Sequence, residues 1–194
     1  MELELEARLV RRLRAGDAAA FDEVYDSFNR RLLSFLARMT KNRSAAEDLV
    51  EETWLRLVSA RQDLHEDTRL GPWLFTVARN LYVSYCRSRA REHSSTPDLI
   101  LLWPGSLPQT PYEIASGNEF EQRLEEGIAA LPPMYREALL LVGVEQLRAV
   151  DAAEVCGISA ELLRQRLSRA RALLSRFLAG ADAAREPVRR KVSP

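Results

Sequence analysis

Two helical stretches of the chain combine arginines with amide and hydroxyl side chains, groups with which proteins contact nucleic acids. The first spans residues 71–91, which contain no acidic residue. Helical spacing gives it a buried stripe of Leu74, Val77, Ala78, Leu81 and Tyr85 and an opposite side of Thr76, Arg79, Asn80, Val83 and Arg87, with Trp73, Phe75 and Tyr82 interleaved. Guanidinium groups contact phosphates and aromatic rings stack on bases, so the pattern predicts a nucleic-acid-binding helix. A basic surface helix without a ligand is the alternative.

The second stretch, residues 160–179, follows a short turn. Gly157 suits the positive φ of a tight turn between helices, Ile158 can fill the angle between them, and Ser159 can cap the second helix. That helix buries Leu163, Leu167, Ala170 and Leu174 and exposes Glu161, Arg164, Gln165, Ser168 and Arg169. The pattern predicts a helix-turn-helix whose second helix enters the DNA major groove, and a generic helical hairpin is the alternative.

A third stretch, residues 44–60, carries acidic side chains beside an apolar stripe. Glu47, Asp48, Glu51 and Glu52 lie opposite a stripe formed by Leu49, Val50, Thr53, Trp54, Leu57 and Val58. The helix dipole favours acidic side chains near a helix N-terminus, so a solvated surface is one interpretation. A docking surface for a basic partner is the other.

Composition restricts the class of protein. The 194 residues are 46% apolar and 29% charged, and Ala, Leu, Arg and Glu predominate, which favours helices in one or two small domains. No apolar run approaches the roughly 20 residues of a membrane span, and we expect no secretory signal. Cys86, Cys156 and His65 have no further Cys or His at metal-ligand spacing, so we expect no metal site. Two cysteines are too few for a disulfide framework, so we expect a reducing cytoplasm. The 28 basic and 28 acidic residues cancel, but residues 161–194 hold 9 basic and 3 acidic side chains.

Periodicity and helix-start signals predict an all-α fold of eight helices in two groups. Asp17, Ser44 with Glu47 three residues on, and Pro72 mark three of the starts. The first group covers residues 3–15, 17–40, 44–60 and 71–90, and the second covers 118–130, 133–143, 148–156 and 160–179. Between them, four prolines indicate a flexible linker, whose apolar run at 99–103 either folds back on a domain or docks on a partner. We therefore expect two small helical domains, 1–92 and 119–180, a linker at 93–118, and a basic tail at 181–194.

Several motifs in this order resemble the extracytoplasmic-function (ECF) group of bacterial sigma-70 RNA polymerase sigma factors, over almost the whole length. Residues 46–57 resemble the family's region 2 helix, which docks on the clamp helices of the polymerase β′ subunit. Residues 73–81 resemble its helix that reads and melts the −10 promoter element, and residues 131–138 resemble the start of its region 4. Residues 157–159 and 166–171 match its helix-turn-helix without gaps.

The resemblance implies a promoter-recognition subunit without catalytic residues, metal or cofactor. Its partners would be core RNA polymerase, through the β′ clamp helices and the β flap, promoter DNA, and an anti-sigma factor, without membrane insertion. The linker would run through the polymerase, and a base of the opened strand would turn out near the loop at residues 62–70. The implied contacts are Asp48, Glu51, Glu52 and Arg56 for the polymerase; His65, Arg69, Trp73, Thr76, Arg79, Asn80 and Arg87 for the −10 element; and Ser159, Glu161, Arg164, Gln165, Ser168, Arg169 and Arg171 for the −35 element.

The sequence departs from the family pattern at two places. Residues 146–149 replace Gly-Leu-Ser-Tyr and lose a serine cap worth roughly 1 kcal/mol. Glu161 and Leu162 stand where a small residue and Thr usually open the recognition helix; Glu161 repels phosphate but can accept a hydrogen bond from cytosine N4. These departures motivate an alternative, a sigma-like regulator that binds polymerase or an anti-sigma factor without productive promoter recognition. A small enzyme using the acidic cluster and His65 is a further alternative.

Overall fold

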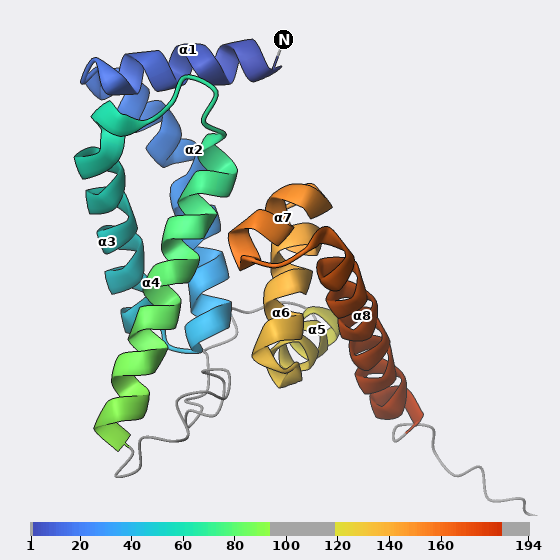
Figure 1. Ribbon diagram of the computed structural model, residues 1–194. Coiled ribbons are helices and arrows are strands. Elements are labelled where there is room, and N and C mark those ends of the chain that lie inside the picture. The colour runs from blue at the N-terminus through green and yellow to red at the C-terminus, as the bar shows by residue number, and fades with distance from the viewer. Residues whose placement is uncertain (1, 94–118, 184–194) are drawn as a thin grey trace, which may run out of the picture.

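The computed structural model describes residues 2–93 and 119–183, and within these residues it contains helices and no strands (Figure 1). This confirms the all-α prediction. An N-terminal unit holds α1 (Glu2–Arg14), α2 (Ala18–Thr40), α3 (Arg43–Ala60), the short 3₁₀ helix η1 (Arg61–Asp63) and α4 (Leu70–His93). A C-terminal unit holds α5 (Glu119–Ala130), α6 (Pro133–Leu139), the π-helical turn η3 (Leu140–Val144), α7 (Ala149–Cys156) and α8 (Ala160–Ala183). The linker and most of the basic tail lie outside the described residues.

Side-chain caps fix the starts of two long helices. Asp17 accepts hydrogen bonds from the N–H groups of Ala19 at 2.9 Å and Ala20 at 3.3 Å, as the sequence predicts for α2. The prediction that Ser44 caps α3 is wrong, because Asn42 is the residue with extended backbone and accepts from the N–H of Ala45 at 3.0 Å. A cap needs non-helical backbone, and Ser44 already lies within the helix.

The three long helices α2, α3 and α4 form the core of the N-terminal unit, and α1 crosses one end (Figure 1). The Phe35 and Phe75 rings meet edge to face with centroids 5.5 Å apart. Buried Phe75 and Tyr82 are therefore core residues and are not free to stack on bases, contrary to the interleaved pattern predicted for this helix. Val83 likewise packs against the core rather than facing solvent. The buried side of α4 consists of Leu70, Leu74, Phe75, Ala78, Tyr82 and Cys86, whereas Val77, Leu81 and Tyr85 of the predicted stripe are only half-buried.

In the C-terminal unit a buried arginine closes the end of α5. Arg136 donates to the carbonyl oxygens of Ile128 at 3.1 Å, Ala129 at 2.6 Å and Leu131 at 2.8 Å. The last carbonyl groups of a helix lack the usual helical donor, so the guanidinium supplies hydrogen bonds at the end of α5 and just beyond it. The helix predicted for residues 133–143 instead changes after Leu139 into a π-helical turn.

The predicted helix-turn-helix is confirmed in α7 and α8. Gly157 has φ +64° in the turn, and the Ser159 hydroxyl oxygen accepts from the N–H of Leu162 at 3.2 Å. Leu163 and Ala170 are fully buried along the inner side of α8. At the start of α7, Arg148 makes no side-chain cap, as the departure from the family pattern predicts.

Candidate functional site

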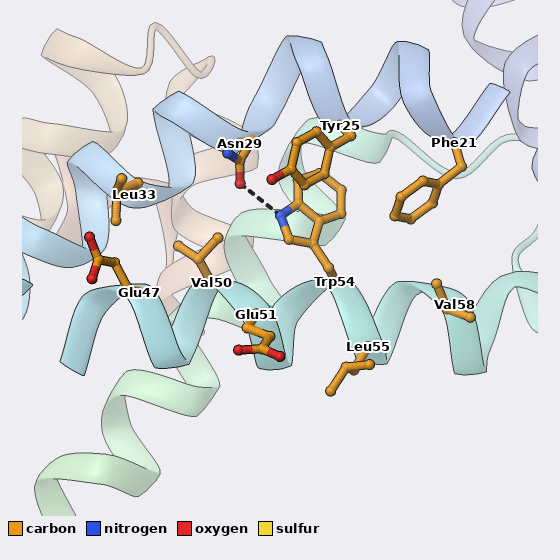
Figure 2. A pocket seen from close by; sticks show the side chains of 10 residues that line it. All are labelled: Phe21, Tyr25, Asn29, Leu33, Glu47, Val50, Glu51, Trp54, Leu55 and Val58. Atoms are coloured by element: carbon orange, nitrogen blue, oxygen red, sulfur yellow. Dashed lines mark hydrogen bonds between the residues drawn. The ribbon is translucent and has the colours of Figure 1, made fainter. Parts of the chain in front are cut away.

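An apolar groove lies between α2 and α3 on the N-terminal unit (Figure 2). It measures about 470 Å³, and Trp54 forms its floor, with the indole N–H donating to Asn29 Oδ1 at 3.0 Å. Tyr25, Leu55 and Val58 border it and are 39%, 55% and 42% exposed. Large exposed apolar side chains around one groove are typical of a surface that binds another molecule.

The acidic side chains of α3 lie beside this groove. Glu47 and Glu51 line it together with Trp54, so the prediction that the acidic face lies opposite Trp54 is wrong for these two residues (Figure 2). Asp48 and Arg56 are exposed, and the Arg56 Nε donates to Glu52 at 2.7 Å. Val58 borders the groove and does not belong to the buried stripe. Of the four predicted docking residues, Glu51 lines the groove, and Asp48, Glu52 and Arg56 lie on the same helix without lining it. Sequence analysis missed the groove because four of its ten lining residues come from α2.

Predicted −10 residues gather on α4 and the loop before it. Trp73 and Thr76 are half-buried, Asn80 and Arg87 are exposed, and helical spacing puts these four on one side of α4. His65 is exposed in the preceding loop.

A hollow of about 480 Å³ adjoins that loop. Its lining is mostly polar, from the end of α1 and from the loop, and consists of Arg11, Arg14, Ala15, Gln62 and Glu66. It lies where the sequence predicts a site for a turned-out base.

Two of the predicted −10 arginines are only partly exposed and form ion pairs in this structure. The Arg79 Nε donates to Glu137 Oε1 at 3.0 Å, and Arg69 forms an ion pair with Asp151. Both carboxylates belong to the C-terminal unit, so these guanidinium groups lie in the contact between the units. Sequence analysis could not find these pairs because the partners lie 58 and 82 residues apart.

The electrostatic environment of these carboxylates differs. Burial raises the pKa of Glu137, and the Arg79 guanidinium opposes that shift. The pKa of Asp151 is lowered, first by the hydrogen bonds from Arg148 and then by Arg69. Burial raises the pKa of the neighbouring Cys156 thiol, so this cysteine is a poor nucleophile.

The outer face of α8 presents six of the seven predicted −35 residues, and Ser159 directly precedes the helix; all seven are exposed. Glu161 accepts from Arg164 Nη2 at 2.9 Å and from Gln165 Nε2 at 3.4 Å, and these hydrogen bonds lower its pKa. The atypical glutamate therefore holds the two side chains best placed to reach base edges.

Among the described residues, no group of three metal-ligating side chains comes together, and Cys86 and Cys156 are both free and buried. No helix of the described part is at once long and apolar enough to cross a bilayer.

A helix-turn-helix in one unit and an exposed polar helix face in the other are features of DNA-binding proteins. Residues 24–92 match the family Sigma-70 region 2, and residues 121–174 match Sigma-70, region 4. The ECF RNA polymerase sigma factor SigM of Bacillus subtilis is 35% identical over 153 residues, which cover 77% of this chain and 90% of SigM. EcfG of Rhodopseudomonas palustris is 34% identical over 151 residues, 76% of this chain and 78% of EcfG.

A solved structure supports the same family. The sigma factor RpoE of Bartonella quintana, in complex with the anti-sigma factor NepR, is 28% identical with a TM-score of 0.66, covering 82% of this chain and 96% of RpoE. The chain belongs to the ECF group of RNA polymerase sigma factors, as the motif order predicts. It is thus a transcription initiation factor, and this class is not enzymatic, which excludes the small enzyme considered above.

Proposed function

We propose that three surfaces divide the work of this initiation factor: the groove with the acidic face of α3 binds core RNA polymerase, α4 reads the −10 element, and α8 reads the −35 element. The observation that carries the proposal is the exposure of the complete predicted face of α8, seated on a buried stripe of a helix-turn-helix. A helix held in this way presents its polar side to the major groove.

For polymerase docking, the apolar border of Tyr25, Leu55 and Val58 supplies contact area, and Asp48 and Glu51 supply charge. Apolar area gives most of the affinity, whereas rim charges steer association and choose the partner. The sequence resemblance points to the β′ clamp helices as the occupant of this surface, and to the β flap as a contact of the C-terminal unit.

For the −10 element, the opened strand follows the side of α4 that carries Asn80, Thr76 and Trp73 toward His65. A base turned out of the stack enters the hollow that Arg11 and Gln62 line. Turning out a base costs a few kcal/mol, which hydrogen bonds and stacking in the site offset.

The remaining assignments concern organisation and partners. Residues 1–92 and 119–180 act as separate recognition domains, with 93–118 as the linker between them and 181–194 as a basic tail. An anti-sigma factor is the regulatory partner, which the similarity to a sigma factor solved with NepR supports. The chain acts in the cytoplasm, where its polymerase is.

The experiment that tests this division measures promoter-directed transcription by core polymerase with wild type, Asn80→Ala and Arg164→Ala. Asn80→Ala should impair promoter opening, and Arg164→Ala should impair recognition of the −35 element. Equal activity of both variants and wild type would refute the assignment.

One observation favours a second candidate function. Glu161 binds the side chains of Arg164 and Gln165, so a sigma-like regulator without productive promoter recognition is consistent with this helix. Polymerase binding without any transcription in the same assay would select that candidate.

A further inference from the structure

The first turn of α4, the proposed −10 helix, takes a hydrogen-bond acceptor from another helix. Arg69 stands just before the first helical residue, and an arginine side chain donates hydrogen bonds but cannot accept them. Within the turn, Pro72 has no N–H, and the Trp73 N–H donates to the Arg69 carbonyl oxygen at 3.0 Å. The N–H of Leu70, a residue only 1% exposed, therefore needs an acceptor from a different segment.

Glu6 on α1 supplies this acceptor. Its Oε1 accepts from the Leu70 N–H at 2.8 Å, across 64 residues of sequence. A side-chain oxygen at this position does what a helix cap does, and the helix dipole favours its negative charge there. The half-buried carboxylate of Glu6 therefore fixes where α4 begins.

The same helix contacts the loop between η1 and α4. Arg11 Nη1 donates to Glu66 Oε2 at 3.2 Å, and both side chains line the hollow assigned to the turned-out base. Figure 1 shows α1 crossing the end of the unit at which this loop lies. Both side chains are more than half exposed, and an exposed ion pair contributes little to stability. The hydrogen bond from Leu70 to Glu6 is therefore the firmer of the two contacts.

Helix α1 is itself held firmly enough to act as a support. Val10 and Leu13 are 0% and 3% exposed and belong to the core. Arg12 Nε donates to Asp17 at 2.7 Å, and its Nη1 donates to Glu23 at 3.1 Å, which ties α1 to the start of α2. All of α1 precedes residues 24–92, which match Sigma-70 region 2.

We propose that α1 is a positioning element of the −10 site, in which Glu6 holds the first turn of α4 and the loop at residues 64–69 in the conformation that receives the turned-out base. The inference rests on the proposed function, in which this loop and α4 read the −10 element. A carboxylate repels phosphate, so Glu6 acts through the Leu70 N–H and not through DNA. Without this acceptor the loop adopts further conformations, and apparent affinity falls with the fraction that stays competent.

The test compares three variants of the full chain, each bound to core polymerase. Glu6→Ala removes the acceptor, whereas Glu6→Gln keeps an acceptor oxygen and removes only the charge. Glu4→Ala is the matched control, because it removes the same charge from an exposed position on the same helix.

Three quantities are measured for each variant. The first is the fluorescence of 2-aminopurine placed in turn at each −10 position of a promoter that the wild-type holoenzyme transcribes, since this base brightens when it leaves the stack. The second is the affinity for core polymerase, and the third is the thermal midpoint of the free chain by far-UV circular dichroism.

Glu6→Ala should weaken capture of the turned-out base and leave core affinity unchanged. If the competent fraction falls from nearly all of the chain to about a fifth, capture weakens about fivefold. Glu6→Gln should restore most of the fluorescence signal, and Glu4→Ala should match wild type in all three measurements.

Normal base capture by Glu6→Ala would overturn the inference, and so would a Glu6→Gln variant as impaired as Glu6→Ala. A parallel loss of core affinity and thermal midpoint would also overturn it, because Glu6 would then support the whole unit rather than the −10 site. The variant Asn80→Ala separates this failure from that of the proposed function. If Asn80→Ala impairs base capture and Glu6→Ala does not, only the positioning role fails; if neither does, the assignment of α4 to the −10 element fails as well.

Discussion

Arg164 and Arg169 should contribute to −35 binding in different ways, although both are exposed on α8. Arg164 lies near the start of the helix, which begins at Ala160. Arg169 is five residues further on, about 7.5 Å along the axis at a rise of about 1.5 Å per residue. The N-terminal part of a recognition helix contacts base edges, so Arg164 is placed for bases and Arg169 for phosphates.

The magnitudes follow from this placement. Loss of a bidentate contact to a base costs roughly 1–3 kcal/mol and is confined to one base position. Arg164→Ala should therefore relax the preference at that position by about 5- to 150-fold. Arg169→Ala should weaken all sequences alike and lower the salt dependence by about one unit of slope.

The assay is a binding series of holoenzyme over −35 variants at two salt concentrations. Ser175→Ala, an exposed position later in α8 with no assigned contact, serves as the control and should leave both quantities unchanged. If Arg164→Ala and Arg169→Ala give the same uniform loss without a change in base preference, the helix is only an electrostatic anchor. The reasoning from its position would then be refuted, and promoter choice would rest on α4.

Three further predictions concern the other surfaces. Reversing the charge at Asp48 and Glu51 should weaken binding to core polymerase and leave the fold intact, since surface substitutions usually cost within about 0.5 kcal/mol. The control Glu126→Lys on α5 should leave core binding unchanged. Unchanged core affinity of the Asp48 and Glu51 variant in a pull-down titration would contradict this prediction. Asn80→Ala should slow promoter opening in a permanganate footprint without weakening core binding, and normal opening would remove α4 from the −10 assignment. Hydrogen bonds from Arg148 and then from Arg69 lower the pKa of Asp151 below the usual value of an aspartate. Ionised Asp151 therefore stabilises the folded state at a pH above that usual pKa, and this contribution is lost as the pH falls through the lowered pKa. Asp151→Asn should therefore lower the thermal midpoint at neutral pH, with a difference from wild type that shrinks in acid; a difference independent of pH would contradict the linkage.

Sequence reasoning succeeds here where the causes are local. Helix periodicity places all eight helices, and Asp17 and Gly157 act as their residue types predict. It fails where two helix starts compete, as at Asn42 and Ser44, because both residue types can cap and only the backbone decides. The interpretation of Phe75 and Tyr82 as interleaved stacking residues fails because the buried side of α4 runs through these two aromatic residues instead of through Val77 and Leu81.

The features that sequence could not supply depend on contacts between distant segments. The apolar groove needs side chains from both α2 and α3, such as Tyr25 and Leu55, and nothing in either helix alone indicates it. The pair of Arg31 with Glu145 joins positions 114 residues apart, and a run of separate charges gives no sign of such a pairing. Only the arrangement of the two units shows that the predicted −10 residues Arg69 and Arg79 form ion pairs with carboxylates of the C-terminal unit.

The central claim is that one chain brings two promoter-reading surfaces to the polymerase. The most direct measurement is transcription by core polymerase, with and without the chain, from a library of random upstream sequences, followed by sequencing of the transcribed templates. We predict start sites downstream of two enriched motifs at a fixed spacing, with Arg164→Ala relaxing the upstream motif and Asn80→Ala the downstream one. Transcription that does not depend on the chain, or enrichment that neither substitution alters, would contradict the account.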